Sequence, residues 1–326
     1  MFRREFLSGS LALAAASVVG PIDASAEANW PSRPVRMIYP YSAGSVGDAT
    51  ARLLAQRFSE VFHQPFIVEN RLGANGTIAA EAVAHAAPDG HTLFYALTPQ
   101  IAISPAISKL RYDPIADFVP ISTINTTPFA LIVHPSLPVT TVQEFIEYVG
   151  ARPDQLAYAE GGVGSINQLA MILFLRRAGI QMIDVGYKGN ALALTDVVSG
   201  HVAAMFSLFG DALQQTKSGM VRMLAVTSER RLLNAPNVPS LAESGFPGFR
   251  AESWHGLMAP AHTPPKIVDR IADEVVRAVR DKEFAEHLME FGLDPVGNTP
   301  REFADLIATD TQIWAEAVRV AKLTGP

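Results

Sequence analysis

Short apolar segments alternate with stretches of helical periodicity in the amino-terminal third of the chain. Strands are predicted by apolar runs at residues 35–39, 66–68 and 92–97. Helices are predicted between them by apolar faces at residues 49–62 and 77–86, which end at Pro65 and before Pro88. Strands and helices that alternate over short connections predict a parallel sheet with right-handed crossovers.

The middle of the chain repeats this alternation with different residues, and the end is helical. Further strands are predicted at residues 131–133, 156–159, 182–185, 202–206 and 223–226. A capping-box pattern, Thr141 followed by Glu144, predicts one helix start. Residues 265–280 and 300–320 carry helical patterns as well. Because no low-complexity linker separates these parts, any domains of this α/β chain share several crossings of the backbone.

The first predicted strand runs into a turn of small residues, in the sequence YPYSAGSVGDATARLLAQRF of residues 39–58. Gly44 and Gly47 lie in the turn, and Asp48 begins the helical run. Backbone N–H groups at a helix start lack intrahelical partners, and the helix dipole favours negative charge there, so such a turn is a general anion site. The alternative is that the turn is only a tight connection, with Asp48 capping the helix. A second glycine-rich loop, at residues 160–165, also follows a predicted strand.

Composition places the chain among globular proteins that bury a large core. It has 326 residues, of which 48% are hydrophobic and 18% charged, which is enough for two domains. The net charge is −6, and the sequence contains no basic run or basic and aromatic stripe. This argues against nucleic acid as a partner.

The amino terminus has the pattern of a signal peptide, which we predict to span residues 1–26. A charged head with Arg3 and Arg4 precedes an apolar segment at residues 11–19, and the small residues 24–26 fit a cleavage site. The arginine pair resembles a twin-arginine signal, although a Sec signal also fits. No later stretch reaches roughly 18 uninterrupted apolar residues, and there is no cysteine to carry a lipid anchor. We therefore expect a soluble periplasmic protein.

The sequence lacks the motifs of metal, hydrolase and phosphate-loop sites. The eight histidines show no metal-ligand spacing, and no Gly-x-Ser-x-Gly or Gly-x-x-x-x-Gly-Lys motif occurs. Residues 162–167 come nearest to a dinucleotide fingerprint, but Asn167 replaces its third glycine. We expect no cofactor, metal or catalytic residue. An exported α/β enzyme acting on a small carboxylate stays the alternative, with Asp48 and Ser45 or Ser165 as its candidate set, which lacks a histidine partner.

Four other side chains have both a functional and a structural interpretation. Lys188 can face an anionic ligand, although lysines in turns are usually solvated. Trp254 and His255 can line a cleft or pack in a hinge. Arg52, one turn into the first helix, fits a structural role better than a carboxylate clamp.

Six segments of the chain together resemble the Bug family, the solute-binding proteins of tripartite tricarboxylate transporters. They are YPYSAGSVGDATARLLAQ, VENRLGANGTIAAEAVAHAAPDGHTL, YKGNALALTDVVSGHVAAMF, LAVTSERR, PNVPSLAESGFPGF and APAHTPPKIVDRI. The similarity covers essentially the whole mature chain in the same order. It implies an α/β, two-domain type II periplasmic-binding-protein fold with a central cleft and hinge strands. It also implies closure on a small carboxylate, held largely by backbone amides and ordered water.

The resemblance further implies a ligand site with walls from both domains. We expect this site to contain Tyr41, Ser42, Ala43, Gly44, Ser45, Asp48, Thr98, Gly162, Val163, Gly164, Ser165, Lys188, Gly189 and Ser207. Five positions depart from the usual family residues, namely Ser45, Gly47, Glu160, Gln168 and Ser207. These departures change the polar groups available to a ligand, so they bear on its identity more than on the fold.

Residues 27–124 and 251–326 are expected to form domain 1, because the carboxyl-terminal helices need a sheet face to cover. Domain 2 then comprises residues 125–250, with hinges near residues 125 and 250. The expected function is capture of a small carboxylate or an amino acid by a monomer, for delivery to membrane transporter subunits.

Overall fold

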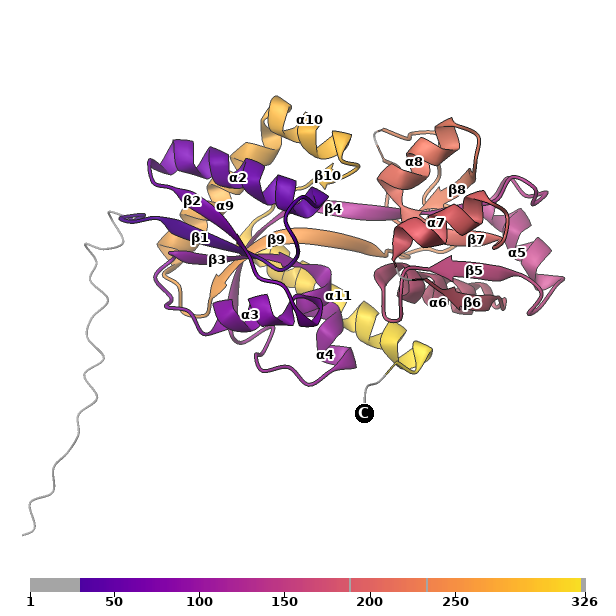
Figure 1. The fold of residues 1–326 in the computed structure, drawn as a ribbon, viewed down its shortest axis with the longest axis horizontal. Helices are drawn as coiled ribbons and strands as arrows, with labels where there is room; N and C mark the ends of the chain where they lie inside the picture. Colours follow the sequence, from indigo (N-terminus) through magenta and orange to yellow (C-terminus); the bar gives the residue numbers. More distant parts are fainter. Residues whose placement is uncertain (1–29, 188, 233, 324–326) are drawn as a thin grey trace, which may run out of the picture.

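Two lobes joined by long strands make up the structure, which is a computed structural model (Figure 1). It describes residues 30–187, 189–232 and 234–323. The predicted signal peptide at residues 1–26 and the predicted ligand residue Lys188 lie outside the described residues.

Lobe 1 is built on a sheet with the strand order β2-β1-β3-β9-β4. Its strands are β1 (Val35–Tyr39), β2 (Phe66–Asn70), β3 (Thr92–Leu97), β9 (Glu252–Pro260), the first part of β4 (Phe118–Val133) and, beside β4, the short β10 (Asp294–Pro295). β1 pairs in parallel with both β2 and β3, as the alternation of strands and helices predicted. β9 is antiparallel to both of its neighbours, β3 and β4.

Lobe 2 is built on the end of β4 and on strands from the middle of the chain. These strands are β5 (Ala157–Glu160), β6 (Ile183–Gly186), β7 (Ala204–Leu208) and β8 (Arg222–Val226). β5 pairs in parallel with β6 and β7, whereas β7 and β8 are antiparallel to β4. The lobe therefore repeats the α/β arrangement of lobe 1.

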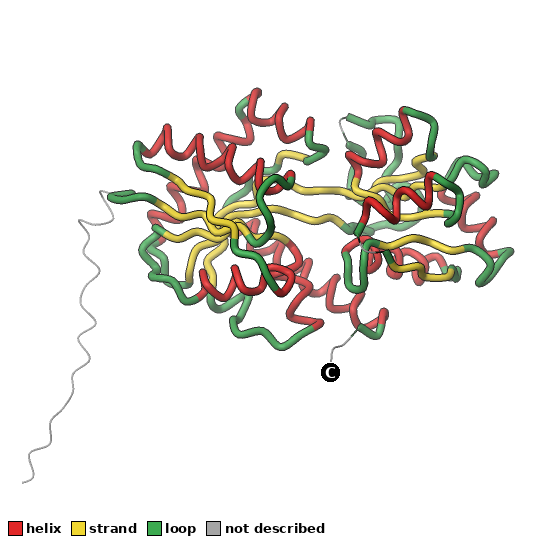
Figure 2. The backbone as a smooth tube through the Cα atoms, in the orientation of Figure 1, coloured by secondary structure: helices red, strands yellow, loops and turns green. Residues whose placement is uncertain are grey.

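Helices cover both faces of each sheet (Figure 2). Those of lobe 1 are α2 (Val46–Phe62), η1 (Ala74–Gly76), α3 (Thr77–Ala84), η2 (Pro99–Ile103), α4 (Ser104–Ile107), α9 (Pro265–Arg280) and α10 (Lys282–Glu290). Those of lobe 2 are α5 (Val142–Gly150), α6 (Ile166–Ala178), α7 (Asn190–Val198) and α8 (Phe209–Lys217). Successive strand residues face opposite helical layers, so Met37 packs with α2 and α9 and Ile38 packs with α3.

Of the two long strands, β4 was only partly predicted from the sequence and β9 was not predicted. Residues 118–128 of β4 pair with β9 in lobe 1, and residues 129–133 pair with β7 and β8 in lobe 2. The apolar pattern predicted only residues 131–133, because the first part of β4 contains two prolines and several polar residues. Neither β9 nor α10 was predicted.

Helix α11 (Pro300–Ala321) packs on both lobes. Phe303, near its start, packs edge-on against Trp254 of lobe 1, with ring centroids 5.0 Å apart. Trp314, near its end, is buried in the core that contains Phe174 of lobe 2. Figure 1 shows α11 running from lobe 1 towards α6. Within the described part of the chain, no helix combines the length and apolar content needed to cross a bilayer.

Candidate functional site

A cavity of about 560 Å³ lies between the two lobes, beside the strands that connect them. The strands β4 and β9 contribute Thr127, Phe129, Ser253 and His255 to its wall. The segment after α10, residues 291–293, adds an apolar wall. The volume suits a small molecule, and a site between two lobes is a common place for one.

Four helices begin at this cavity. Its lining includes residues 45–47 at the start of α2 and residues 165–167 at the start of α6. It also includes Asn190, the first residue of α7, and residues 210–211 in the first turn of α8. First-turn N–H groups lack intrahelical acceptors, and the dipoles are positive at these ends. The cavity can therefore favour an anionic group without a cationic side chain.

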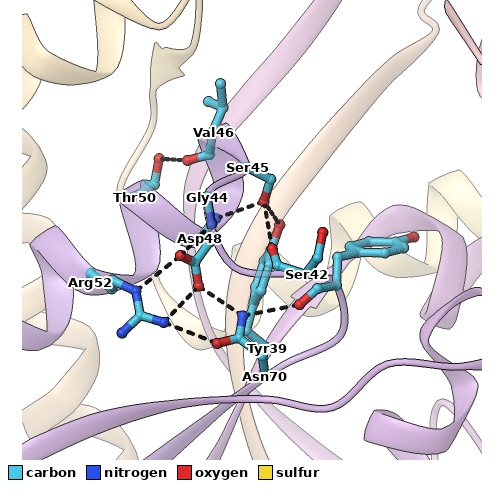
Figure 3. Close-up of polar contacts among 10 residues, drawn as sticks. Tyr39, Ser42, Gly44, Ser45, Val46, Asp48, Thr50, Arg52 and Asn70 are labelled. Atoms are coloured by element: carbon cyan, nitrogen blue, oxygen red, sulfur yellow. Dashed lines mark hydrogen bonds and ion pairs between the residues drawn. The ribbon is translucent and has the colours of Figure 1, made fainter.

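The Asp48 side chain holds the loop before α2 through hydrogen bonds, and it does not line the cavity (Figure 3). Gly44 has φ +86°, and its N–H donates to Asp48 Oδ2 at 3.0 Å. Arg52 donates to both carboxylate oxygens of Asp48, at 2.9 and 3.1 Å, and Asn70 Nδ2 donates to Oδ1 at 2.8 Å. Burial alone would raise the pKa of Asp48, but the hydrogen bonds from Arg52, Asn70 and Gly44 hold it below its usual range. The helix is capped by Ser45 rather than by Asp48, since Ser45 Oγ accepts from the Asp48 N–H.

The loop before α6 matches the loop before α2 at its glycine and at the serine that follows. Gly164 has φ +77°, and its N–H donates to Gln168 Oε1 at 2.7 Å, as Gly44 donates to Asp48. Ser165 is the N-cap residue with an extended backbone, as Ser45 is in lobe 1. Gln168 in turn donates to Asp184 at 2.8 Å. The two lobes thus present equivalent Gly-Ser turns to the cavity.

Glu160 is buried at the second loop and changes how helix α6 is capped. The Glu160 carboxylate accepts from the Gly162 N–H and from Ser165 Oγ, the latter at 3.2 Å. Burial raises the pKa of Glu160, and the nearby Asp184 carboxylate raises it further. Because Ser165 Oγ is directed to Glu160, it does not cap α6 as Ser45 caps α2.

Three polar side chains that line the cavity have buried atoms without a hydrogen-bond partner among the described residues. These atoms are Asn167 Nδ2, Asn190 Oδ1 and Thr127 Oγ1. Asn167 is only 2% exposed. Because buried polar groups are nearly always paired in folded proteins, these three groups retain unused hydrogen-bonding capacity in residues of the cavity wall.

The sequence model described as "Tripartite tricarboxylate transporter family receptor" matches residues 50–323. The chain belongs to this receptor family. The protein BugT of Bordetella pertussis (strain Tohama I) is 34% identical over 94% of each chain. The solved structure of R. palustris Rpa4515 with adipate is 32% identical, with a TM-score of 0.75 over 91% of this chain and 100% of that one. The periplasmic binding protein BugD is 30% identical, with a TM-score of 0.71 over 91% and 100%.

Membership of the receptor family confirms the resemblance to Bug proteins and the expected class of fold. The chain is a solute-binding protein with the two-domain α/β fold of periplasmic binding proteins. The family and the solved relatives are binding receptors rather than enzymes.

The receptor's cavity includes four of the site residues implied by the resemblance, namely Tyr41, Ser45, Gly164 and Ser165. Nine others do not line it: Ser42, Ala43, Gly44, Asp48, Thr98, Gly162, Val163, Gly189 and Ser207. Thr98 is fully buried, and its Oγ1 accepts from the Trp254 N–H at 2.8 Å. Val163 is 78% exposed. Lys188 lies outside the described residues. Direct ligand contact by these residues stays a prediction.

Several lining residues were not identified from the sequence. They are Asn75, Thr127, Asn167, Asn190, Asp211 and Phe291. Asn167 and Asn190 lie in the first turns of helices that follow glycines, so a scan of such turns for amides would have found them. Asp211 and Phe291 gave no local signal, because they lie on segments that meet only in the folded chain.

Neutral polar groups complete the cavity. Tyr41 Oη accepts from Gln100 Nε2 at 2.9 Å and donates to Asn75 Oδ1 at 3.1 Å, and burial raises the pKa of Tyr41 to about 12. His255 is buried, which lowers its pKa to about 4, so its imidazole is neutral at pH 7. Among the described residues, no three His, Asp or Glu side chains are grouped to hold a metal ion.

Proposed function

We propose that this receptor captures a small carboxylate in the periplasm and presents it to the membrane subunits of a tripartite tricarboxylate-type transporter. The observation that carries the proposal is the convergence of two matching Gly-Ser helix starts, α2 and α6, on one cavity from opposite lobes. The relative Rpa4515 was solved with adipate, a dicarboxylate, which supports the ligand class.

Uncharged donors supply the binding energy in this proposal. The described lining residues include no lysine or arginine, but they do include first-turn N–H groups, the Asn167 amide and the Thr127 hydroxyl. Hydrogen bonds from such donors to a carboxylate contribute on the order of 1.5–3 kcal/mol each before desolvation is subtracted. A few of them acting together account for specific capture of a small anion.

The two lobes act as domains that close on the ligand about hinges near residues 125 and 250. The change of β4 from one sheet to the other between residues 128 and 129 supports the first hinge. The Ala251 N–H donates to Thr227 of lobe 2 at 3.2 Å just before β9 enters lobe 1, which supports the second. Domain 1 then comprises residues 27–124 and 251–326, and domain 2 comprises residues 125–250.

The ligand is bound and released unchanged by a monomer in this proposal. Neither loop serine has the partners of a nucleophile, because Ser165 Oγ bonds to Glu160 and Ser45 Oγ lies 3.0 Å from Tyr39 Oη. Within the described residues, no imidazole contacts either hydroxyl. Binding without turnover is therefore the expected behaviour.

Calorimetry with the mature protein tests this proposal. Adipate, glutarate, pentanoate and L-norvaline are titrated beside glucose and a neutral tripeptide, and at least one carboxylate is expected to bind at one-to-one stoichiometry. Asn167→Leu removes a cavity donor at similar volume, and we expect it to weaken binding about tenfold. Gln155→Leu, at an exposed turn, is the control and should bind normally. Binding of glucose or the tripeptide without any carboxylate would overturn the proposal.

A further inference from the structure

Asp211 stands out among the residues that line the cavity. It lies in the first turn of α8. His255 is neutral at pH 7, so Asp211 is the only side chain with a formal charge among the described lining residues. No described residue gives it a hydrogen bond or an ion pair. A cavity built to attract an anion thus also contains a carboxylate.

Three other acidic residues in first turns of this chain are held by the backbone in front of their helices, whereas Glu283 of α10 has no such bond among the described residues. Asp48, Glu144 and Glu302 accept hydrogen bonds from the N–H groups of Gly44, Thr140 and Thr299, respectively. Such bonds stabilise a helix start, and a negative charge there also favours the helix dipole. Asp211 lacks the backbone bond, so a capping role does not account for its position. Its carboxylate is free to contact what the cavity holds.

The charges around the cavity separate into two kinds of subsite. The starts of α2 and α6, with the unpaired amide of the buried Asn167, favour a carboxylate. Asp211 favours a positive group and repels a second carboxylate, most strongly once closure removes water from between them. Asp211 is an exposed residue, yet partial desolvation of its carboxylate raises the pKa of Asp211. A ligand ammonium group would supply a cationic partner.

We propose that Asp211 makes this receptor selective for carboxylates that also carry an ammonium group, and against dicarboxylates. This inference rests on the proposed function, because it assumes that a ligand carboxylate occupies the helix starts. It assigns the ligand to a different class from the adipate found in the relative Rpa4515.

Three ligand pairs that differ by an ammonium group test the proposal by calorimetry near pH 7. They are glutarate and 5-aminopentanoate, adipate and 6-aminohexanoate, and pentanoate and L-norvaline. The wild-type receptor is expected to bind the ammonium member of at least one pair about tenfold more tightly than its partner. Asp211→Asn should weaken binding of that ammonium member about tenfold and strengthen binding of the dicarboxylates.

Asp273→Asn is the matched control, because Asp273 is exposed on α9 and does not line the cavity. It makes the same change of charge and should leave every affinity unaltered. If Asp211→Asn does not fold, as judged by its melting curve, Asp211→Ser serves in its place.

The outcomes separate this inference from the proposed function. The wild-type receptor could instead bind the dicarboxylates more tightly, with an affinity that rises as the pH falls. Such a result would mean that a protonated Asp211 donates a hydrogen bond to them. It would overturn this inference but not the proposed function. An equal loss, or no loss, for both members of each pair in Asp211→Asn would also overturn it alone. Failure of every carboxylate to bind would overturn both proposals.

Discussion

Asp48 and Gln168 occupy equivalent positions in the two loops that begin α2 and α6. Each accepts a hydrogen bond from the glycine four residues earlier. The charge environment differs, because Asp48 is paired with Arg52 whereas Gln168 is neutral and donates to Asp184. In each lobe this side chain therefore fixes the turn by accepting from the glycine N–H. Its other hydrogen bonds are with neighbouring side chains, among them Arg52 for Asp48 and Asp184 for Gln168.

Asp48→Asn should destabilise the fold more than it weakens ligand binding. Each oxygen of the buried Asp48 carboxylate accepts two hydrogen bonds, and an asparagine amide would turn an N–H₂ group toward existing donors. We expect the free energy of unfolding to fall by about 1.5–3 kcal/mol, from loss of charge-assisted bonds. Urea denaturation beside Asp273→Asn measures this. Equal stability of the two variants would show that the Asp48 contacts contribute little.

Glu252 should make stability depend on pH. Its pKa is raised from 4.5 to about 7, chiefly by burial. Arg250 opposes this rise, and the carboxylates of Asp294, Asp310 and Glu229 contribute to it. Between these two pH values the folded state retains a proton that the unfolded state has lost, so this contribution to stability falls as pH rises. Relative to wild type, Glu252→Gln should gain about 1–3 kcal/mol between pH 5 and pH 8. Denaturation curves at both pH values measure the difference, and a constant difference would contradict the assignment.

At the scale of elements, the site depends on where helices begin. Glycine permits the left-handed backbone at Gly44 and Gly164, and the serine that follows each returns the chain to an extended conformation before its helix. Both helices then direct their first turns to one cavity. The glycines thus determine the direction of the N–H donors.

Gly164→Val should weaken binding, whereas Gly219→Val should not. The two glycines have nearly the same backbone angle, with φ of +77° and +75°, so each substitution costs about 1–2 kcal/mol of backbone strain. An added Cβ at Gly219 has open space, and at Gly164 it would lie 3.2 Å from Ile107 Cδ1. Only the Gly164 change alters the cavity loop, and we expect about a tenfold loss of affinity for the best-bound carboxylate. Similar affinities for the two variants would contradict a ligand role for this turn.

At the scale of the whole molecule, the lobes are linked by more than the two strands. α11 packs on both lobes. Gly210 of α8 also contacts Gly292 of lobe 1 closely, since a Cβ added to Gly292 would lie 2.8 Å from the Gly210 Cα. The Gly210 contact lies beside the cavity. Any closure must therefore occur with these contacts kept or remade.

Small-angle scattering should detect closure on a ligand. Donors from both lobes reach one carboxylate only when the lobes approach, so binding free energy shifts the population toward the closed form. We expect the radius of gyration to fall by about an ångström at saturating ligand. Asn167→Leu at the same ligand concentration serves as the control, with a smaller change. An unchanged radius for the saturated wild-type receptor would exclude domain closure.

The sequence by itself determined the local elements and the family. Apolar periodicity located β1, β2 and β3 and the helices α2, α3, α9 and α11, because the side chains of one face repeat at short, regular intervals. Glycine and serine marked the two loops, since backbone conformation at a turn is a local property. The resemblance over the whole mature chain identified the receptor family.

Tertiary structure alone decided the rest of the site. The first part of β4 and the whole of β9 were missed because their polar residues are buried only by neighbouring strands and by the cavity. Asp48 and Asp211 both lie in first turns of helices. Asp48 is paired with Arg52, whereas Asp211 lines the cavity without a partner among the described residues. Sequence spacing cannot separate these two cases, because the electrostatic partners of an acid depend on which distant segments pack beside it.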